Sequence, residues 1–283
     1  MSSVALSLTV RSAPASARIQ RGAPLTVLGA SRGPDLTFRP FFVASLLIGI
    51  TAGATWGALM LLQAALAGRF TAVSIWHMNA HAHAQIYGFV TLMILGFAYQ
   101  AFPRFWAAPL ALPMLGRWVL LAMLAGIGLQ SAAWLLASPT LTPPLSLAAG
   151  TLEAAALCTF FVQLLLTRRR SSQPMDVSTL LLVIAAGLLP LHAVAESLHA
   201  IAMVGAESRS ALLSQLADWQ TPLRNLQLRG TVLFMIVGVA IRVLPRVFVM
   251  PPIPERAQRR LLSLMLASLI AESSAFILMR QTG

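Results

Sequence analysis

The sequence predicts an all-α membrane protein, a polytopic bundle of about seven transmembrane helices. The 283-residue chain is 58% hydrophobic and only 10% charged, whereas a soluble domain carries about 25% charged residues. Several apolar runs approach the ~20 residues that a helix needs to cross the hydrocarbon of a bilayer. The short alternating segments typical of a transmembrane barrel do not occur in the sequence. These observations favour membrane helices in contact with a lipid bilayer.

Seven spans are expected, separated by connections that contain helix-breaking prolines. The spans cover residues 41–66, 81–102, 118–137, 144–167, 180–204, 223–244 and 261–280. Prolines occur after the second span at Pro103 and Pro113, and after the third at Pro139. Pro174 precedes the fifth span, and Pro245 follows the sixth. The prolines therefore support the division of the apolar sequence into separate helices.

The arginines predict the orientation of these spans. All twenty basic residues are Arg, and fourteen lie in segments on the side of the amino terminus against four on the other side. Positively charged segments stay in the cytoplasm. We therefore expect a bacterial inner-membrane protein with a cytoplasmic amino terminus and a periplasmic carboxyl terminus. Because the net charge of +12 is spread between the spans, it does not indicate a nucleic-acid partner.

The first 40 residues are expected to form a disordered cytoplasmic tail. They are rich in Ser, Ala and Arg, contain one acid at Asp35, and lack the compact apolar core of a secretory signal. An organelle transit peptide has a similar composition and is the alternative interpretation.

Two parts of the chain resemble each other at an offset of 142 residues. Residues 83–105 and 225–247 share nine identical residues at 23 gapless positions, including Gly88 with Gly230 and Pro103 with Pro245. Copies that lie four spans apart run in the same direction, which predicts a parallel repeat. The predicted organisation is a first three-helix repeat at 41–137, a connector with span 4 at 138–179, and a second repeat at 180–283.

All five histidines fall in the outer half of the predicted bundle. His77, His81 and His83 lie at the start of span 2, and His192 and His199 lie on span 5. Neutral imidazole is a common ligand of copper, zinc and heme iron. We therefore predict that His81, His83, His192 and His199 bind a heme b, and that His77, His81 and His83 form a metal site, with copper as the candidate. Interfacial packing and helix-to-helix hydrogen bonds are the alternatives for these side chains.

Polar residues at the same depth are expected to support this site. Ionisable groups in hydrocarbon cost several kcal/mol, about 2.5 or more, so they usually face a partner or a cavity. Glu153, Glu196, Glu272 and Gln85 are predicted supporting residues that orient the imidazoles. Cys158 is the only cysteine of the chain, which excludes covalent c-type heme attachment through a CxxCH motif.

The segment 37–42, with the sequence Thr-Phe-Arg-Pro-Phe-Phe, and the Trp76-His77 pair resemble the NnrS family. That family comprises bacterial membrane proteins associated with heme, copper and nitric oxide stress. The His-x-His-x-Gln pattern from His81 to Gln85, followed by Gly88-Phe89, is also similar to a helix of the catalytic subunits of heme–copper oxidases and nitric oxide reductases. The chain has fewer spans than family members usually have and too few histidines for a complete oxidase-type centre. The resemblance implies a short, heme-binding relative.

The predicted function is heme binding, with copper as a further cofactor, in the nitric oxide response or in respiratory or denitrification metabolism. The resemblance also makes respiratory or denitrification membrane proteins the expected partners. Two other classes fit the sequence. A parallel repeat with polar residues at the midplane is typical of a carrier of small solutes, metal or heme. A short polytopic chain is also typical of a non-catalytic partner or assembly subunit.

Overall fold

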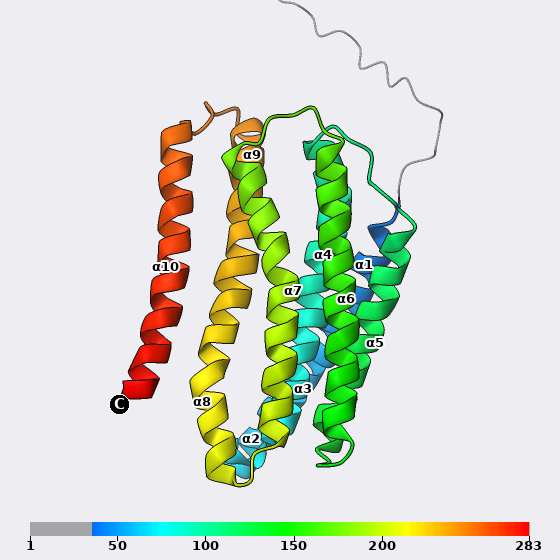
Figure 1. Ribbon diagram of the computed structural model, residues 1–283. Coiled ribbons are helices and arrows are strands. Elements are labelled where there is room, and N and C mark those ends of the chain that lie inside the picture. The colour runs from blue at the N-terminus through cyan, green and yellow to red at the C-terminus, as the bar shows by residue number, and fades with distance from the viewer. Residues whose placement is uncertain (1–35, 283) are drawn as a thin grey trace, which may run out of the picture. The chain divides into compact units, whose positions relative to one another are not determined.

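The structure, a computed structural model, describes residues 36–282, and its long elements are helices throughout this range (Figure 1). Seven of these helices are long and apolar enough to cross a membrane. They comprise Arg39–Ala67, Ile75–Phe105, Leu115–Leu136, Thr142–Arg169, Val177–Val204, Arg209–Val247 and Glu255–Arg280. The predicted all-α membrane bundle is therefore confirmed.

Three of the spans are divided by a segment of π-helix, which shifts the hydrogen-bond pattern of the backbone. The elements of the first two spans are α1 (Arg39–Ile48), η1 (Gly49–Thr55) and α2 (Trp56–Ala67), then, after the short η2 (Phe70–Ala72), α3 (Ile75–His83), η3 (Ala84–Thr91) and α4 (Leu92–Phe105). The remaining elements are α5 (Leu115–Leu136), α6 (Thr142–Arg169), α7 (Val177–Val204), α8 (Arg209–Asn225), η4 (Leu226–Leu233), α9 (Phe234–Val247) and α10 (Glu255–Thr282).

Several span boundaries differ from the sequence prediction by a few residues, and the start of the sixth span differs by more. The first helix already begins at Arg39, whereas residues up to 40 were assigned to the tail, whose residues 1–35 lie outside the described part of the chain. The sixth span begins at Arg209 instead of residue 223. The sequence prediction missed its first turns because polar residues such as Gln215 and Asp218 lower the local hydropathy. This extra length forms α8.

Side-chain caps mark the start of three helices. Ser74 accepts a hydrogen bond from the backbone N–H of Trp76 at the start of α3. Asp176 accepts one from Thr179 at the start of α7, and Ser208 caps α8 in the same way. Such caps satisfy amide groups that have no partner within the helix. They fix where the site-bearing helices α3 and α7 begin.

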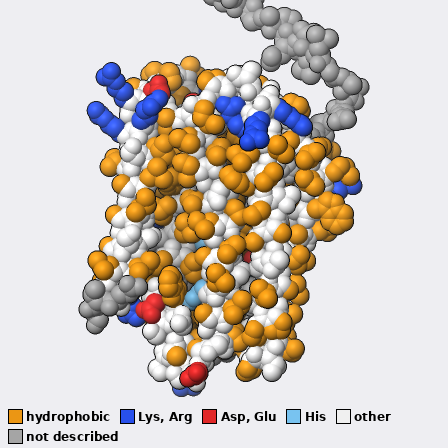
Figure 2. All heavy atoms as spheres, viewed as in Figure 1, with side chains coloured by type: hydrophobic (Ala, Val, Ile, Leu, Met, Phe, Trp, Pro, Cys, Tyr) orange, Lys and Arg blue, Asp and Glu red, His pale blue; other side chains and the backbone are white. Residues whose placement is uncertain are grey.

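The helices pack antiparallel around a core of large apolar side chains. α5, α6 and α7 lie side by side, α4 packs against α1, α3 packs against α5, η3 contacts both α1 and α5, and α9 packs against α7 (Figure 1). α10 lies beside α8 at the edge of the bundle and buries little of its surface. The face shown in Figure 2 is covered with apolar side chains between two more polar ends, and its arginines gather mainly at one end. This surface suits a helical bundle surrounded by lipid.

The helical boundaries of spans 2 and 6 recur at the offset of 142 residues. Both spans contain an eight-residue π-helix, η3 and η4, followed by a 14-residue α-helix, α4 and α9. Both α-helices end just before a residue with positive φ, Ala107 and Val249. Gly88 and Gly230 each leave room for an aliphatic side chain of the preceding repeat helix, Ile48 and Leu188. These matches support the predicted repeat, and the rotation that relates the two halves stays a prediction.

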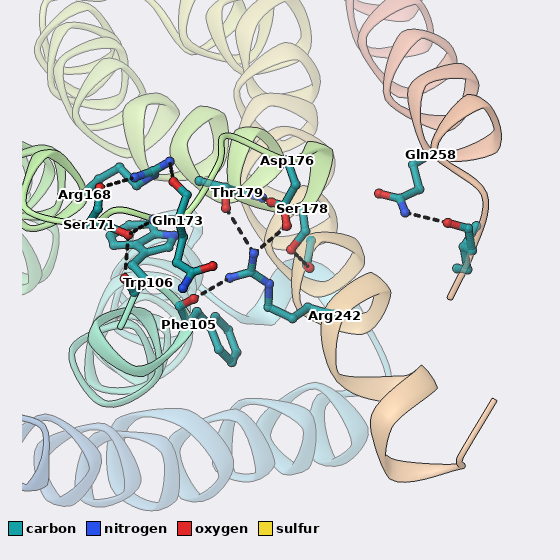
Figure 3. Close-up of polar contacts among 12 residues, drawn as sticks. Phe105, Trp106, Arg168, Ser171, Gln173, Asp176, Ser178, Thr179, Arg242 and Gln258 are labelled. Atoms are coloured by element: carbon teal, nitrogen blue, oxygen red, sulfur yellow. Dashed lines mark hydrogen bonds and ion pairs between the residues drawn. The ribbon is translucent and has the colours of Figure 1, made fainter. Parts of the chain in front are cut away.

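One arginine joins the ends of three spans (Figure 3). Arg242 of α9 donates to the carbonyl of Phe105 at 3.0 Å and to the carboxylate of Asp176 at 2.5 Å. Its guanidinium also lies over the ring of Phe105 at 5.4 Å. Burial would raise the pKa of Asp176, but the hydrogen bonds from Thr179 and Arg242 outweigh this and hold the pKa below its ordinary value. Arg242 therefore has the partner that an arginine within a span requires.

Candidate functional site

A chain of polar side chains crosses the interior of the bundle between four spans. We call this set the buried polar chain. Its members, in order of contact, are Glu153 of α6, His83 and Tyr87 of span 2, His192 and Glu196 of α7, and Arg224 and Gln227 of span 6.

The buried polar chain begins with a buried hydrogen bond between α6 and α3. The Nε2 atom of His83 lies 2.8 Å from Oε1 of Glu153, and both side chains are almost fully buried. Gly126 of α5 makes the space for this carboxylate, since a Cβ atom there would lie 2.5 Å from Cγ of Glu153. An Nε2–H that donates to Glu153 leaves Nδ1 as an acceptor, and Nδ1 is buried without a partner in the described structure. The ring of His83 is thereby fixed in position.

Tyr87 connects the two histidines. Its ring stacks on the ring of His83 with centroids 4.5 Å apart and an angle of 19° between the planes. Its hydroxyl lies 2.7 Å from Nδ1 of His192 and donates to it when the ring hydrogen is on Nε2, the nitrogen that faces Glu196. Tyr87 lies four positions after His83, which places both on one face of their helix. Tyr87 therefore occupies the space between the two imidazoles.

His192 continues the chain toward span 6. With Nδ1 as the acceptor, Nε2 carries the hydrogen and lies 3.6 Å from Oε2 of Glu196, a distance longer than a hydrogen bond. The other oxygen of Glu196 lies 3.6 Å from Arg224. Arg224 in turn donates to the side-chain carbonyl of Gln227 at 2.9 Å. Hydroxyl, imidazole and carboxylate thus follow one another, an order of groups that is suited to moving a proton.

His81 points away from this chain. Its Nδ1–H donates to the carbonyl of Ala52 in η1 at 2.9 Å, since a carbonyl can only accept. The neutral ring then has Nε2 as its free electron pair, which is the usual arrangement of a histidine that binds metal. His81 lines a groove of about 910 Å³ between α2, α3 and the start of α8. The groove lies at the upper end of the ~300–1,000 Å³ that is typical of ligand sites.

The other predicted residues lie elsewhere. His77 is exposed one turn before His81, and both of these rings lie 6.2 Å from the ring of Trp56. His199 lines a separate cavity near α8 and α10. Gln85 packs against Gly53, and Glu272 pairs with Arg229. Within residues 36–282, no three His, Cys, Asp or Glu side chains form a group that could hold a metal ion.

The sequence prediction named four of the seven members of the buried polar chain, namely His83, His192, Glu153 and Glu196. It missed Tyr87, because a tyrosine in an apolar run is usually a packing residue with its hydroxyl at a partner. Arg224 was counted with the arginines outside the membrane, and Gln227 was noted only for the repeat. Position 87 did carry one signal, since the matching residue of the second copy is Arg229 instead of an apolar residue.

Two places are candidate heme sites: the region between His83 and His192, and the groove beside His81. Only the groove has room for a heme. Between His83 and His192 it does not fit, because the phenol ring of Tyr87 contacts both imidazoles. The groove beside His81 does fit a flat group. Gly57 faces the ring there, and a Cβ at that position would lie 3.0 Å from Cε1 and 3.4 Å from Nε2 of His81. The glycine therefore keeps the ligand nitrogen accessible.

Seven apolar helices, a polar chain across the bundle interior and an oriented histidine at an apolar groove define a multi-pass membrane protein with a candidate cofactor site. The chain matches the family described as NnrS protein over residues 35–282. It therefore belongs to the NnrS family, whose members are membrane proteins associated with heme and the nitric oxide response. No curated protein and no solved structure matches this chain.

Proposed function

We propose that this protein binds a b-type heme through His81 and acts in the nitric oxide response or in denitrification metabolism at the bacterial inner membrane. The observation that carries the proposal is the hydrogen bond from Nδ1 of His81 to the carbonyl of Ala52. It leaves Nε2 with a free electron pair that is suited to bind iron, in a side chain that lines the groove. A bound heme would supply an iron centre for a diatomic ligand or for electron transfer.

The residues around the groove support a macrocycle. Its lining is mainly aliphatic and aromatic, which matches the faces of a porphyrin. Two methionines of the lining, Met60 and Met78, carry sulfur atoms that are suited to heme iron. Arg209 also lines the groove, and its guanidinium is suited to a propionate. His81 would hold the iron, and Arg209 would orient the acidic edge.

Part of the buried polar chain would transfer protons in this function. Tyr87 can pass its hydroxyl proton to Nδ1 of His192, while the Nε2 proton of His192 moves toward Glu196. Arg224 stabilises the negative charge of Glu196 when the carboxylate is ionised. The transfer would be confined to Tyr87, His192 and Glu196, because the contact between Tyr87 and His83 is ring stacking and cannot carry a proton.

The copper prediction rests on the family association and on His77, which stands one helical turn before His81. The respiratory or denitrification partners likewise rest on the family. We retain both as part of the proposal, with the heme as its testable centre.

The experiment is the visible spectrum of the protein purified from heme-replete cells. We expect a Soret band in the wild type and its loss in His81→Ala, with partial recovery when free imidazole is added. His77→Ala is the matched control, since it removes an exposed histidine of the same helix, and its Soret band should persist. Helix content by circular dichroism confirms that each variant is folded. A wild type without bound heme, or a Soret band that survives in His81→Ala, would overturn the proposal.

A further inference from the structure

A second cavity lies farther along α8, between α7, α8 and α10. It has a volume of about 540 Å³ and is formed mainly by apolar side chains such as Leu198, Pro222 and Leu226. All three helices belong to membrane spans. A compound dissolved in the bilayer would therefore match the character of its walls.

His199 is the side chain of this cavity whose hydrogen-bonding groups find no partner in the described part of the protein. Both of its ring nitrogens are buried, and neither has a hydrogen-bond partner in the described structure. A buried polar atom without a partner carries an energetic penalty, so a group outside the protein is the expected partner. A neutral imidazole has one donor and one acceptor. The missing group must therefore accept a hydrogen bond, donate one, or do both.

The charges near the cavity favour a neutral ligand. Arg224, Arg229 and Arg280 lie within two helical turns of lining residues. They are already paired with carboxylates, namely Glu196, Glu272 and Asp218 in that order. A phosphate or carboxylate head group would find no unpaired cation among these three. A neutral polar head group on an apolar tail fits the arrangement better than an anionic lipid does.

We propose that this cavity binds the head group of a membrane quinone or quinol at His199. A quinone carbonyl accepts a hydrogen bond from the imidazole N–H, and a quinol hydroxyl donates one to the other ring nitrogen. The indole of Trp219 also lines the cavity and provides an aromatic face for the flat ring. Ser273 and Gln215 lie in the wall as further hydrogen-bonding groups.

The cavity also borders the buried polar chain. His199 follows Glu196 by three residues on α7, and the lining residue Leu223 precedes Arg224. A bound head group would thus lie next to Glu196 and Arg224 of the buried polar chain. The quinone site goes beyond the heme proposal and does not depend on it, because the two places have no lining residue in common.

The test is equilibrium binding of a short-chain quinone to the purified full-length protein in nanodiscs of uncharged lipid, combined with photolabelling by an azidoquinone. We expect saturable binding and labelled peptides from α7, α8 or α10. His199→Leu should weaken binding roughly fivefold, as the loss of a hydrogen bond predicts. Ala202→Phe should abolish binding by filling the cavity, since Ala202 lines it.

Val194→Phe is the matched control, because Val194 is exposed on the same helix and does not line the cavity. Its binding should equal that of the wild type, and all variants should keep the Soret band of a heme-loaded protein. Absence of saturable binding to the wild type would overturn the quinone site. Equal binding by Ala202→Phe and Val194→Phe would overturn it as well. Loss of the Soret band in the wild type would count against the heme proposal alone.

Discussion

Tyr87 is the residue on which the interior of the bundle depends. It is 1% exposed, and it contacts His83 of its own span and His192, which lies 105 positions later in the chain. Its hydroxyl links the half of the buried polar chain on α6 and α3 to the half on α7 and span 6. Tyrosine suits this position because its ring packs like an apolar side chain while its hydroxyl supplies the polar contact.

We predict that Tyr87→Phe destabilises the protein by about 1–3 kcal/mol, because it leaves Nδ1 of His192 buried without a partner. Chemical unfolding in detergent, followed by circular dichroism, measures this loss. Thr159→Val is the control, since it also removes a hydroxyl hydrogen bond but at an exposed position. Its effect should stay within about 0.5 kcal/mol. Equal stability of the two variants would show that the Tyr87–His192 contact contributes nothing.

Residue types in the sequence predicted part of the site. The remaining contacts depend on which way each side chain points in the folded bundle. Ionisable groups in apolar runs correctly identified Glu153, Glu196, His83 and His192 as side chains that need a partner. The spacing of two positions puts His81 and His83 on different sides of their helix, but it does not identify what each side chain contacts. The packing of η1 against α3 gives His81 its carbonyl partner, whereas the packing of α6 against α3 gives His83 its glutamate. Contacts between distant spans cannot be read from spacing along one helix.

At the scale of helices, hydropathy predicted most of the fold. The seven spans follow from apolar length, but the π-helical segments do not, because they depend on how neighbouring helices pack. η3 and η4 begin and end at matching positions in spans 2 and 6. π-helical segments frequently mark functional sites, and here they hold Tyr87 and Gln227. A sequence prediction of helix alone could not separate these segments from ordinary α-helix.

The Arg242 contact at the helix ends gives a pH-dependent prediction. The pKa of Asp176 is lower in the folded protein than in the unfolded chain, so its stabilising contribution is fully present above the unfolded pKa of about 4. It is lost as the pH falls through the lower folded pKa. We expect the stability difference between the wild type and Asp176→Asn to be largest near pH 6 and to shrink below pH 4.

Thermal unfolding of both proteins between about pH 3 and 7 measures this difference. Asn keeps the capping oxygen for the backbone of Thr179, so the comparison isolates the charge that faces Arg242. In Arg242→Gln the pH dependence that is due to Asp176 should be weaker. A stability difference that grows toward low pH would contradict the assignment.

At the scale of the whole molecule, the arrangement distinguishes the three classes of function. A carrier requires a polar cavity that opens to each side, whereas the space between His83 and His192 is filled by Tyr87. A structural partner subunit does not require an oriented free imidazole nitrogen at a groove. The proposed heme protein would use the free imidazole nitrogen, and the spectrum of the purified protein separates it from the other two classes.

The depth of the site depends on the orientation of the bundle. Seven crossings would place the two ends of the chain on opposite sides of the membrane, and the arginine distribution predicts that the amino terminus is cytoplasmic. His81 and the buried polar chain would then lie in the periplasmic half, where a ligand from outside the cell arrives first. We expect alkaline phosphatase fused after Gly283 to be active. The same enzyme fused after Arg170 should be inactive, because that connection carries three consecutive arginines. The reverse pattern would place the heme groove at the cytoplasmic side and would require a cytoplasmic source for its ligand.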